Sequence, residues 1–203
     1  MFSGIIETTA LVLDAQKDRA NVRIDVKKPN DFNDINVGDS IAHDGVCLTV
    51  ESFDDAKITY ILAAETLQIT KWSEENLKGH AMNVERSMKM SDRIHGHLVT
   101  GHVDCRLKVL ESKDLGGSLI IRFELNPDVQ GLVWSKGSVC LNGVSLTVND
   151  VEGDWFEVCL IPETLRRTNL GELKPGDEVN FEADQIARAL RRMIELGELK
   201  NIK

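Results

Sequence analysis

The stretch that decides the fold is "DGVCLTV", residues Asp44–Val50, because it predicts the turn and the second strand of a β-hairpin. Its leading Asp-Gly pair is favoured in two-residue type I′ turns, which require a positive φ at both positions. Such a turn fixes the pairing register, so that Cys47 faces Ala42 across the hairpin. A near copy, "NGVSLTV", occurs at Asn142–Val148. The sequence therefore predicts two equivalent hairpins, with a thiol in the first and a hydroxyl in the second.

The repeat extends well beyond the hairpin, because three further pairs of segments match at a spacing of 97 or 98 residues. Each copy has the size of a small domain, and the period is too long for a solenoid. We therefore predict an N-terminal domain over 1–97 and a C-terminal domain over 98–186. The matching pairs are "FSGIIE" (2–7) with "VTGHVD" (99–104), "AAETLQIT" (63–70) with "IPETLRRT" (161–168), and "MNVERS" (82–87) with "VNFEAD" (179–184).

Strands dominate both copies. "ANVRIDVKK" (20–28) alternates apolar and polar residues with the period of a half-buried strand, and "SLIIRFEL" (118–125) takes the same place in the second copy. "AKITYILA" and "DWFEVCLI" are rich in β-branched or aromatic residues and follow turns that contain Asp or Gly. Several short strands at regular spacing predict an all-β fold, with a barrel or a sandwich in each half.

The two hairpins are predicted to have unlike faces, because side chains alternate along a strand. One face is apolar, whereas the other carries only small, weakly polar residues. Such a face suits a flat molecule lying close to the backbone, and we favour a ligand or partner surface over a solvated one. In the first hairpin the apolar face collects Ile41, His43, Val46, Leu48 and Val50, and the small face collects Ser40, Ala42, Cys47 and Thr49. In the second, the small face collects Ser138, Cys140, Ser145 and Thr147.

Three polar differences separate the copies. His102 aligns with Ile5, Asp184 aligns with Ser87, and Ser145 aligns with Cys47. The second copy thus has a proton-transfer residue and a carboxylate, and the first has the thiol. Two similar pockets with different polar groups would suit two molecules of one compound in different roles.

The tail after the second copy changes to a helical pattern. Its apolar residues recur at helical spacing, Asp184 is placed to cap the start, and Gly197 is placed to end the helix. A lone amphipathic helix at a chain end either packs on its own domain or joins copies of the chain, and the pattern alone favours neither. The apolar stripe consists of Ile186, Leu190, Met193 and Ile194.

Composition narrows the class of protein. The net charge is −9 with scattered Lys and Arg, which argues against a sequence-independent nucleic-acid binder. No apolar run approaches the roughly 20 residues of a membrane helix, and the N-terminus lacks the basic start of a signal peptide. We therefore expect a cytoplasmic protein that associates with neither membranes nor nucleic acid. The cysteines are widely spaced without a CxxC pair, and we expect free thiols at Cys47, Cys105, Cys140 and Cys159.

The histidines of "HGHLVTGH" raise the alternative of a metal site. His95 and His97 form a His-x-His pair, with His102 nearby, and such residues can ligate a metal. No clear cluster of further ligands accompanies them, so our prediction includes no metal. A metal-dependent β-barrel protein stays open as a different class of function.

At the level of motifs, the chain resembles the riboflavin synthase family of the trimeric α-type over essentially its whole length. The motifs are "MFSGIIE", "GDSIAHDGVCLTV", "AAETL", "GHLVTGHVD", "NGVSLTV", "IPETLRRT" and "VNFEAD". The resemblance implies two tandem six-stranded Greek-key β-barrels and a C-terminal α-helix over 187–203 around which a homotrimer forms. It implies dismutation of two 6,7-dimethyl-8-ribityllumazine molecules to riboflavin and 5-amino-6-ribitylaminouracil, without cofactor or metal. Enclosure by a lumazine synthase partner is left open.

The resemblance also implies an active site between the N-barrel of one subunit and the C-barrel of its neighbour. The implied catalytic candidates are Cys47, His102, Ser145 and Asp184, of which His102 and Asp184 are expected to assist proton transfer. The implied substrate-binding residues of the N-barrel are Gly4, Ile5, Ile6, Ser40, Cys47, Leu48, Thr49, Ile61, Leu62, Ala63, Ala64, Glu65 and Thr66. Those of the C-barrel are Gly101, His102, Val103, Lys136, Ser145, Leu146, Thr147, Ile161, Pro162, Glu163, Thr164, Leu165 and Arg166.

Three alternatives accompany this reading. Thr66 and Thr164 follow predicted strands, so either hydroxyl could cap a helix as well as hold the ribityl chain. A non-catalytic lumazine- or flavin-binding antenna protein would keep the fold and lose polar residues of the second pocket. A purely structural trimer is the third alternative, and it would show no affinity for lumazine.

Overall fold

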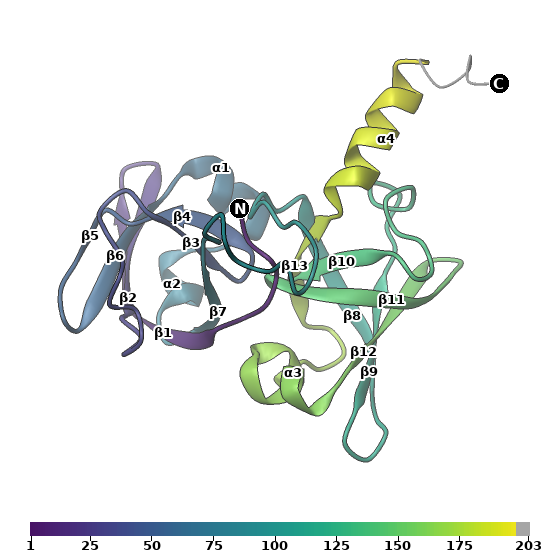
Figure 1. The fold of residues 1–203 in the computed structure, drawn as a ribbon, viewed down its shortest axis with the longest axis horizontal. Helices are drawn as coiled ribbons and strands as arrows, with labels where there is room; N and C mark the ends of the chain where they lie inside the picture. The colour runs from purple at the N-terminus through teal and green to yellow at the C-terminus, as the bar shows by residue number, and fades with distance from the viewer. Residues whose placement is uncertain (198–203) are drawn as a thin grey trace.

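The computed structural model describes residues 1–197, which form two β-domains lying side by side, with a helix that projects from the second (Figure 1). The predicted all-β tandem fold is confirmed. The first domain contains β1 (Thr8–Asp18), β2 (Asn21–Lys27), β3 (Ser40–His43), β4 (Val46–Thr49), β5 (Ser52–Phe53), β6 (Lys57–Leu62), α1 (Ala64–Thr70), α2 (Glu74–Leu77) and β7 (Ala81–Arg86). The second contains β8 (Cys105–Asp114), β9 (Leu119–Glu124), β10 (Ser138–Leu141), β11 (Val144–Glu152), β12 (Trp155–Leu160), α3 (Pro162–Arg167), the 3₁₀ turn η1 (Asn169–Glu172), β13 (Glu178–Ala183) and α4 (Gln185–Glu195).

The second domain is a closed six-stranded barrel in the order β10-β11-β12-β9-β8-β13. Strands β9 and β10 follow each other in the chain but are not neighbours, so the chain crosses an end of the barrel between them, as in a Greek key. Closure pairs every strand on both sides and leaves no free edge.

The first domain has the same strands, with one of them broken. Its sheet runs β4-β3-β7-β1-β2-β6-β5, and its two ends, β4 and β5, correspond together to the single strand β11. At the break, Val50 N donates to Asp39 O whereas Glu51 N donates to Thr59 O, so the chain changes partners there. Strand β11 passes the equivalent point with a register shift between Val148 and Asp150. The six-stranded barrel is therefore closed in the second copy and interrupted in the first.

Both hairpins have the predicted turn and register. Asp44 and Gly45 have φ values of 42° and 79°, and Asn142 and Gly143 have 44° and 80°, as type I′ turns require. Cys47 pairs with Ala42. The pairing of Ser145 with Cys140 in the second hairpin follows the same register.

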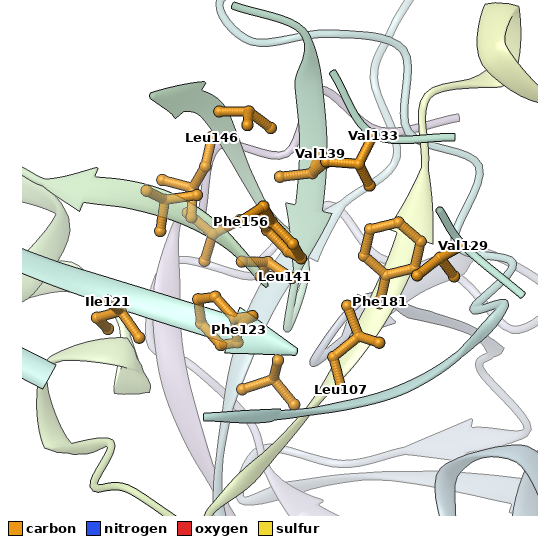
Figure 2. Packing of buried hydrophobic residues seen from close by; sticks show 14 of the residues in the cluster. Leu107, Ile121, Phe123, Val129, Val133, Val139, Leu141, Leu146, Phe156 and Phe181 are labelled. Atoms are coloured by element: carbon orange, nitrogen blue, oxygen red, sulfur yellow. The ribbon is translucent and has the colours of Figure 1, made fainter. Parts of the chain in front are cut away.

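The apolar hairpin faces fill two separate barrel cores. Figure 2 shows the second core, where Phe123, Phe156 and Phe181 lie together among aliphatic side chains. The rings of Phe123 and Phe156 stack with centroids 5.5 Å apart. Burial of each such ring contributes about 1.5–3 kcal/mol. The small hairpin faces turn away from these cores, and their residues Ala42 and Cys140 are buried with Phe2 and Val99 in a third cluster.

The two barrels meet at their hairpin turns through reciprocal contacts. The backbones approach so closely that a Cβ on Gly45 would lie 2.7 Å from Gly143 N, and one on Gly143 would lie 2.8 Å from Gly45 N. Asn83 Nδ2 donates to Asn142 O, and its counterpart Asn180 donates to Asp44 O, both at 2.9 Å. The glycine of each turn therefore serves both the hairpin and the contact between the barrels.

Helix α4 spans Gln185–Glu195, within the tail where the resemblance implies a helix over 187–203, and it has the cap and the stop that the sequence pattern predicts. The Asp184 carboxylate accepts from Ile186 N at 2.8 Å, and Gly197 follows the last turn with a φ of 75°. The predicted tail continues to residue 203, and 198–203 lie outside the described residues. Within residues 1–197, no helix has the length and hydropathy to cross a membrane. The first turn of the helix packs on the second barrel through Ala187, and the rest projects from it (Figure 1). The stripe residues stay exposed, so packing on its own domain does not cover the stripe.

Candidate functional site

The segment that leads into each barrel docks on the hairpin of the other barrel. Ser145 N donates to Gly4 O at 2.7 Å, and Cys47 N donates to Gly101 O at 2.9 Å. The two segments cross where Phe2 and Val99 form an antiparallel bridge. The prediction that each leading segment serves the pocket of its own barrel is therefore wrong. Gly4, Ile5 and Ile6 belong with Ser145, and Gly101, His102 and Val103 belong with Cys47.

Apolar packing follows the same exchange. Ile6 is buried in the core of the second barrel, and Val103 packs against the core of the first. The docked backbone needs glycine at its closest point, because a Cβ on Gly4 would lie 2.6 Å from Ser145 Cβ. A Cβ on Gly101 would lie 2.5 Å from Cys47 Cβ. Both glycines also have positive φ, so each docked segment needs glycine for its backbone conformation as well as for the lack of space.

Two buried glutamates hold the leading segments in place. Glu85 accepts from Ser3 N and Gly4 N, and Glu182 accepts from Thr100 N and Gly101 N. Burial raises the pKa of Glu85, and the hydrogen bonds from Ser3 and Gly4 oppose that rise. Sequence reasoning did not select these glutamates as site residues. The sequence did contain a signal for them, because both glutamates occupy the same place in the repeated segments 82–87 and 179–184.

The first pocket lies against the first hairpin and has a volume of about 240 Å³. Cys47 supplies the thiol and His102 the imidazole, and they come from different copies of the repeat. Helix α1 contributes Glu65 and Thr66 to the wall. A thiol, an imidazole, a carboxylate and a hydroxyl thus surround one small cavity. The remaining lining residues are Val46, Ile69, Thr70, Gly101 and Val103.

The site at the second hairpin contains a histidine that the repeat did not reveal. His97 Nδ1 lies 2.7 Å from Ser145 Oγ. Burial lowers the pKa of His97, against an opposing effect of the negative charges of Asp184 and Glu182. His97 Nε2 is buried and has no hydrogen-bond partner among residues 1–197. Sequence reasoning placed His97 only in the metal alternative, because the linker between the copies has no counterpart to align.

The linker also covers Ser145. Gly96 passes so close that a Cβ there would lie 2.7 Å from Ser145 Oγ and 2.2 Å from Ser3 O. The serine is therefore held between the linker, the docked segment at Gly4 and its own hairpin. Asp184 influences this site through its charge, while its carboxylate caps helix α4.

The other predicted site residues vary in their access to these two sites. Leu48, Leu62 and Leu146 are buried in the barrel cores, so only their backbone groups can face a ligand. Lys136 is exposed and has a φ of 66°, at the position where the first copy has Gly38. A lysine in that conformation is strained, and such strain is concentrated at functional positions.

Two alternatives from the sequence are wrong. The N-caps of α1 and α3 are Ala63 and Ile161, so neither Thr66 nor Thr164 caps its helix. Within residues 1–197, no group of three His, Cys, Asp or Glu side chains gathers as metal ligands, so the three histidines do not form the suggested metal site. The prediction of free thiols is confirmed for all four cysteines.

Comparison with known proteins identifies relatives over nearly the whole chain. The profile of the Lumazine binding domain family matches twice, at residues 3–87 and 100–184. A riboflavin synthase of Brucella abortus (strain 2308) is 38% identical over 200 residues, covering 96% of this chain and 98% of that protein. Riboflavin synthases of Actinobacillus pleuropneumoniae and Bacillus subtilis (strain 168) are 34% and 32% identical, each covering 96% of this chain and 90% of that protein.

Solved structures of LumP share the fold. LumP complexed with riboflavin superposes with a TM-score of 0.82 at 20% identity, covering 90% of this chain and 99% of that chain. LumP complexed with 6,7-dimethyl-8-(1'-D-ribityl) lumazine superposes with a TM-score of 0.81 at 21% identity over the same shares. At this level of identity the likeness extends to the fold alone.

Proposed function

This chain belongs to the riboflavin synthase family, whose lumazine binding domain it carries twice, and from that premise we propose how its two pockets perform the reaction. The reaction converts two molecules of 6,7-dimethyl-8-ribityllumazine into riboflavin and 5-amino-6-(D-ribitylamino)uracil. One lumazine donates a four-carbon unit and the other accepts it, which makes the enzyme a transferase. The reaction requires neither cofactor nor metal.

The observation that carries the proposal is the pair of related but unlike sites, a pocket at the first hairpin and a site beneath the linker at the second. Each is built from the hairpin of one barrel and the leading segment of the other, so both offer the same backbone frame. The first adds Cys47 and His102, and the second adds Ser145 and His97. Equal frames would bind the same heterocycle, and unequal polar groups would give the two molecules different roles.

The chemistry needs modest assistance from the side chains. The C7 methyl of the lumazine is an unusually acidic carbon acid, because its carbanion delocalises into the ring. His102 and Asp184 assist the proton transfers, and Cys47 and Ser145 position the substrates or relay protons. A nucleophile can also add at C7 of the acceptor to activate it. Most of the acceleration comes from holding two lumazines in the correct relative orientation.

The paired His97 and Ser145 extend this assignment. Because burial lowers the pKa of His97, its imidazole is neutral at pH 7 and can accept a proton. In the tautomer protonated at Nε2, the Ser145 hydroxyl donates to Nδ1 and becomes a better nucleophile or proton relay. The second pocket therefore has an acceptor for a proton within hydrogen-bond distance of its hydroxyl.

We further propose a cytoplasmic homotrimer formed through α4. The stripe residue Ile186 is 66% exposed and Ile194 is 62% exposed, which is costly for an isolated chain in water. Joining three such helices would bury the stripe and would bring the first pocket of one subunit toward the second pocket of its neighbour. Association with lumazine synthase is compatible with this arrangement and needs its own test.

The turnover assay tests the proposed function. The purified chain is mixed with the lumazine as sole substrate, in a chelator-treated buffer, and riboflavin fluorescence is followed. Riboflavin formation is the expected result. A non-catalytic antenna protein would instead retain the lumazine unchanged, and a structural trimer would leave it unbound.

A further inference from the structure

Arg188 links the projecting helix to the segment that carries His102. It lies one turn into α4, and its Nη2 donates to His102 O and to Asp104 Oδ2, both at 2.6 Å. The same Asp104 oxygen accepts from Ala183 N at 2.8 Å. The guanidinium therefore joins the start of the helix, the end of β13 and the leading segment.

In the two copies of the repeat, the arginine that pairs with the carboxylate of the leading segment comes from different elements. Glu7 of the first copy corresponds to Asp104, and its partner is Arg86 at the end of β7. The counterpart of Arg86 in the second copy is Ala183, which has no cationic side chain. The second copy instead uses Arg188 from α4, a helix for which the first copy has no equivalent. The contact that a strand makes within the first copy is thus made by the helix in the second.

Arg188 completes a set of contacts that fixes the backbone around His102. On the preceding side, Glu182 accepts from Thr100 N and Gly101 N, and His102 N lies 3.3 Å from Thr100 Oγ1. On the following side, Arg188 holds the carbonyl of His102 itself. The imidazole is exposed and lines the first pocket, so these main-chain contacts set the point from which the ring enters that pocket.

The guanidinium is not arranged for maximal stability alone. Its side chain is 29% exposed, yet Nε is buried and has no hydrogen-bond partner among residues 1–197. A buried donor without a partner costs free energy. The guanidinium is therefore placed so that Nη2 makes both of its contacts, while Nε is left without a partner.

We propose that Arg188 is a positioning residue that sets the direction of the His102 imidazole in the first lumazine pocket. The inference rests on the proposed function, since it assigns a task to His102. It also means that the helix proposed to assemble the trimer supports one of the two pockets directly. A residue that merely anchored α4 would affect assembly or folding and would act on turnover independently of His102.

The test compares R188A and R188K with R192A in the full-length protein. Arg192 is the matched control, because it lies one turn further along the same helix, is 68% exposed and pairs with Glu195. We expect R188A to lower kcat about tenfold with a smaller change in KM, because the imidazole is misdirected while the pocket remains. R188K should recover part of the loss, since a lysine supplies the charge without the planar donor geometry. R192A should match the parent chain.

A double-mutant cycle with H102Q separates positioning from anchoring. If Arg188 acts through His102, R188A should cause little further loss of kcat in the H102Q background. Fully additive losses would overturn the inference. Sedimentation analysis of each variant must show the assembly state of the parent, and a loss of kcat that appears only together with dissociation would also overturn it.

A second readout does not depend on turnover. In the NMR spectrum of chain labelled at histidine ring carbons, R188A should move or broaden the His102 signal, whereas R192A should leave it in place. An unmoved His102 signal in R188A would overturn the inference even in an active enzyme. Absence of riboflavin formation by the parent chain, with a moved signal, would refute the proposed function and leave the geometric claim supported.

Discussion

His97 and Ser145 are 48 residues apart in the sequence, and the imidazole Nδ1 of one lies 2.7 Å from the hydroxyl oxygen of the other. The contact joins the linker between the barrels to the hairpin of the second barrel. It places a neutral, half-buried imidazole beside a hydroxyl that the first copy replaces with the Cys47 thiol. This asymmetry distinguishes the two hairpin sites most directly.

Removal of the imidazole should slow turnover. We expect H97A to lower kcat roughly a hundredfold, the loss typical of a general base, and to leave lumazine binding in the first pocket intact. Stopped-flow formation of riboflavin measures the rate, and quenching of lumazine fluorescence measures binding. H95A is the matched control, because His95 is an exposed residue of the same linker. Equal rates for H97A and H95A would remove His97 from the mechanism.

The pH dependence follows from the direction of the His97 shift. Burial places the pKa of His97 below 6.5, so the imidazole is neutral and able to accept a proton above that value. The contribution of His97 to kcat should be constant at neutral pH and should fall as the pH drops through the lowered pKa. A pH profile of kcat for the parent and for H97A measures it. A loss that began well above pH 6.5 in the parent alone would contradict the assignment.

The docking of the leading segments depends on glycine. G101A should destabilise the fold and distort the first pocket, because its Cβ would lie 2.5 Å from Cys47 Cβ in a backbone with a φ of 81°. The unfavourable φ alone costs about 1–2 kcal/mol. Gly79 has a similar φ of 83°, but a Cβ there would have nothing within 4 Å. G79A therefore measures the cost of the unfavourable φ without a steric clash. Urea unfolding should show a clearly larger loss for G101A, and equal losses would disprove the close docking.

His43 should make the first barrel sensitive to acid. It is buried beside Tyr60, and burial lowers its pKa from 6.5 to about 4. Between these values the unfolded chain binds the proton and the folded chain does not, so stability falls as the pH drops from 6.5 to 4. The shift corresponds to about 3 kcal/mol.

The second copy suggests the variant that tests this prediction. Leu141 occupies the place of His43 in the second barrel. H43L therefore gives the first barrel the apolar side chain that the second barrel already has at this site. Urea unfolding at pH 7 and at pH 4.5 should show a smaller acid-induced loss in H43L than in the parent. An identical loss in the two proteins would show that His43 is not the cause.

The proposed trimer depends on the exposed stripe of α4. I194E should dissociate the chain to monomers, because it puts a charge into the stripe while the Asp184 cap and the Arg188 contacts remain. Sedimentation velocity measures the mass, and E195Q is a control on the polar side of the same turn. A trimer that persisted in I194E would exclude the stripe as the assembly surface.

The hairpins could be predicted from the sequence because a two-residue turn sets the register locally. The repeat then extended that prediction to two barrels. The exchange of leading segments could not be predicted in this way, because aligning Gly4 with Gly101 says nothing about which hairpin each one meets. That exchange depends on the contact between barrels, where Phe2 crosses Val99.

The candidate site was predicted unevenly for the same reason. Cys47, His102 and Ser145 were found because they differ between aligned copies, and the structure brings the first two into one pocket. His97 was missed as the partner of Ser145, because the linker has no aligned counterpart. The broken strand of the first barrel was also missed, since the letters of the two hairpins match up to Val50 and the chain changes partners after it.

The stoichiometry of the reaction tests the central claim most directly. The lumazine is supplied alone, and its consumption is measured together with the formation of riboflavin and of the aminouracil. Two cooperating pockets predict two lumazines consumed for each riboflavin and each aminouracil formed. A chain that binds lumazine and forms neither product, or one that forms riboflavin from a single lumazine, would contradict the account.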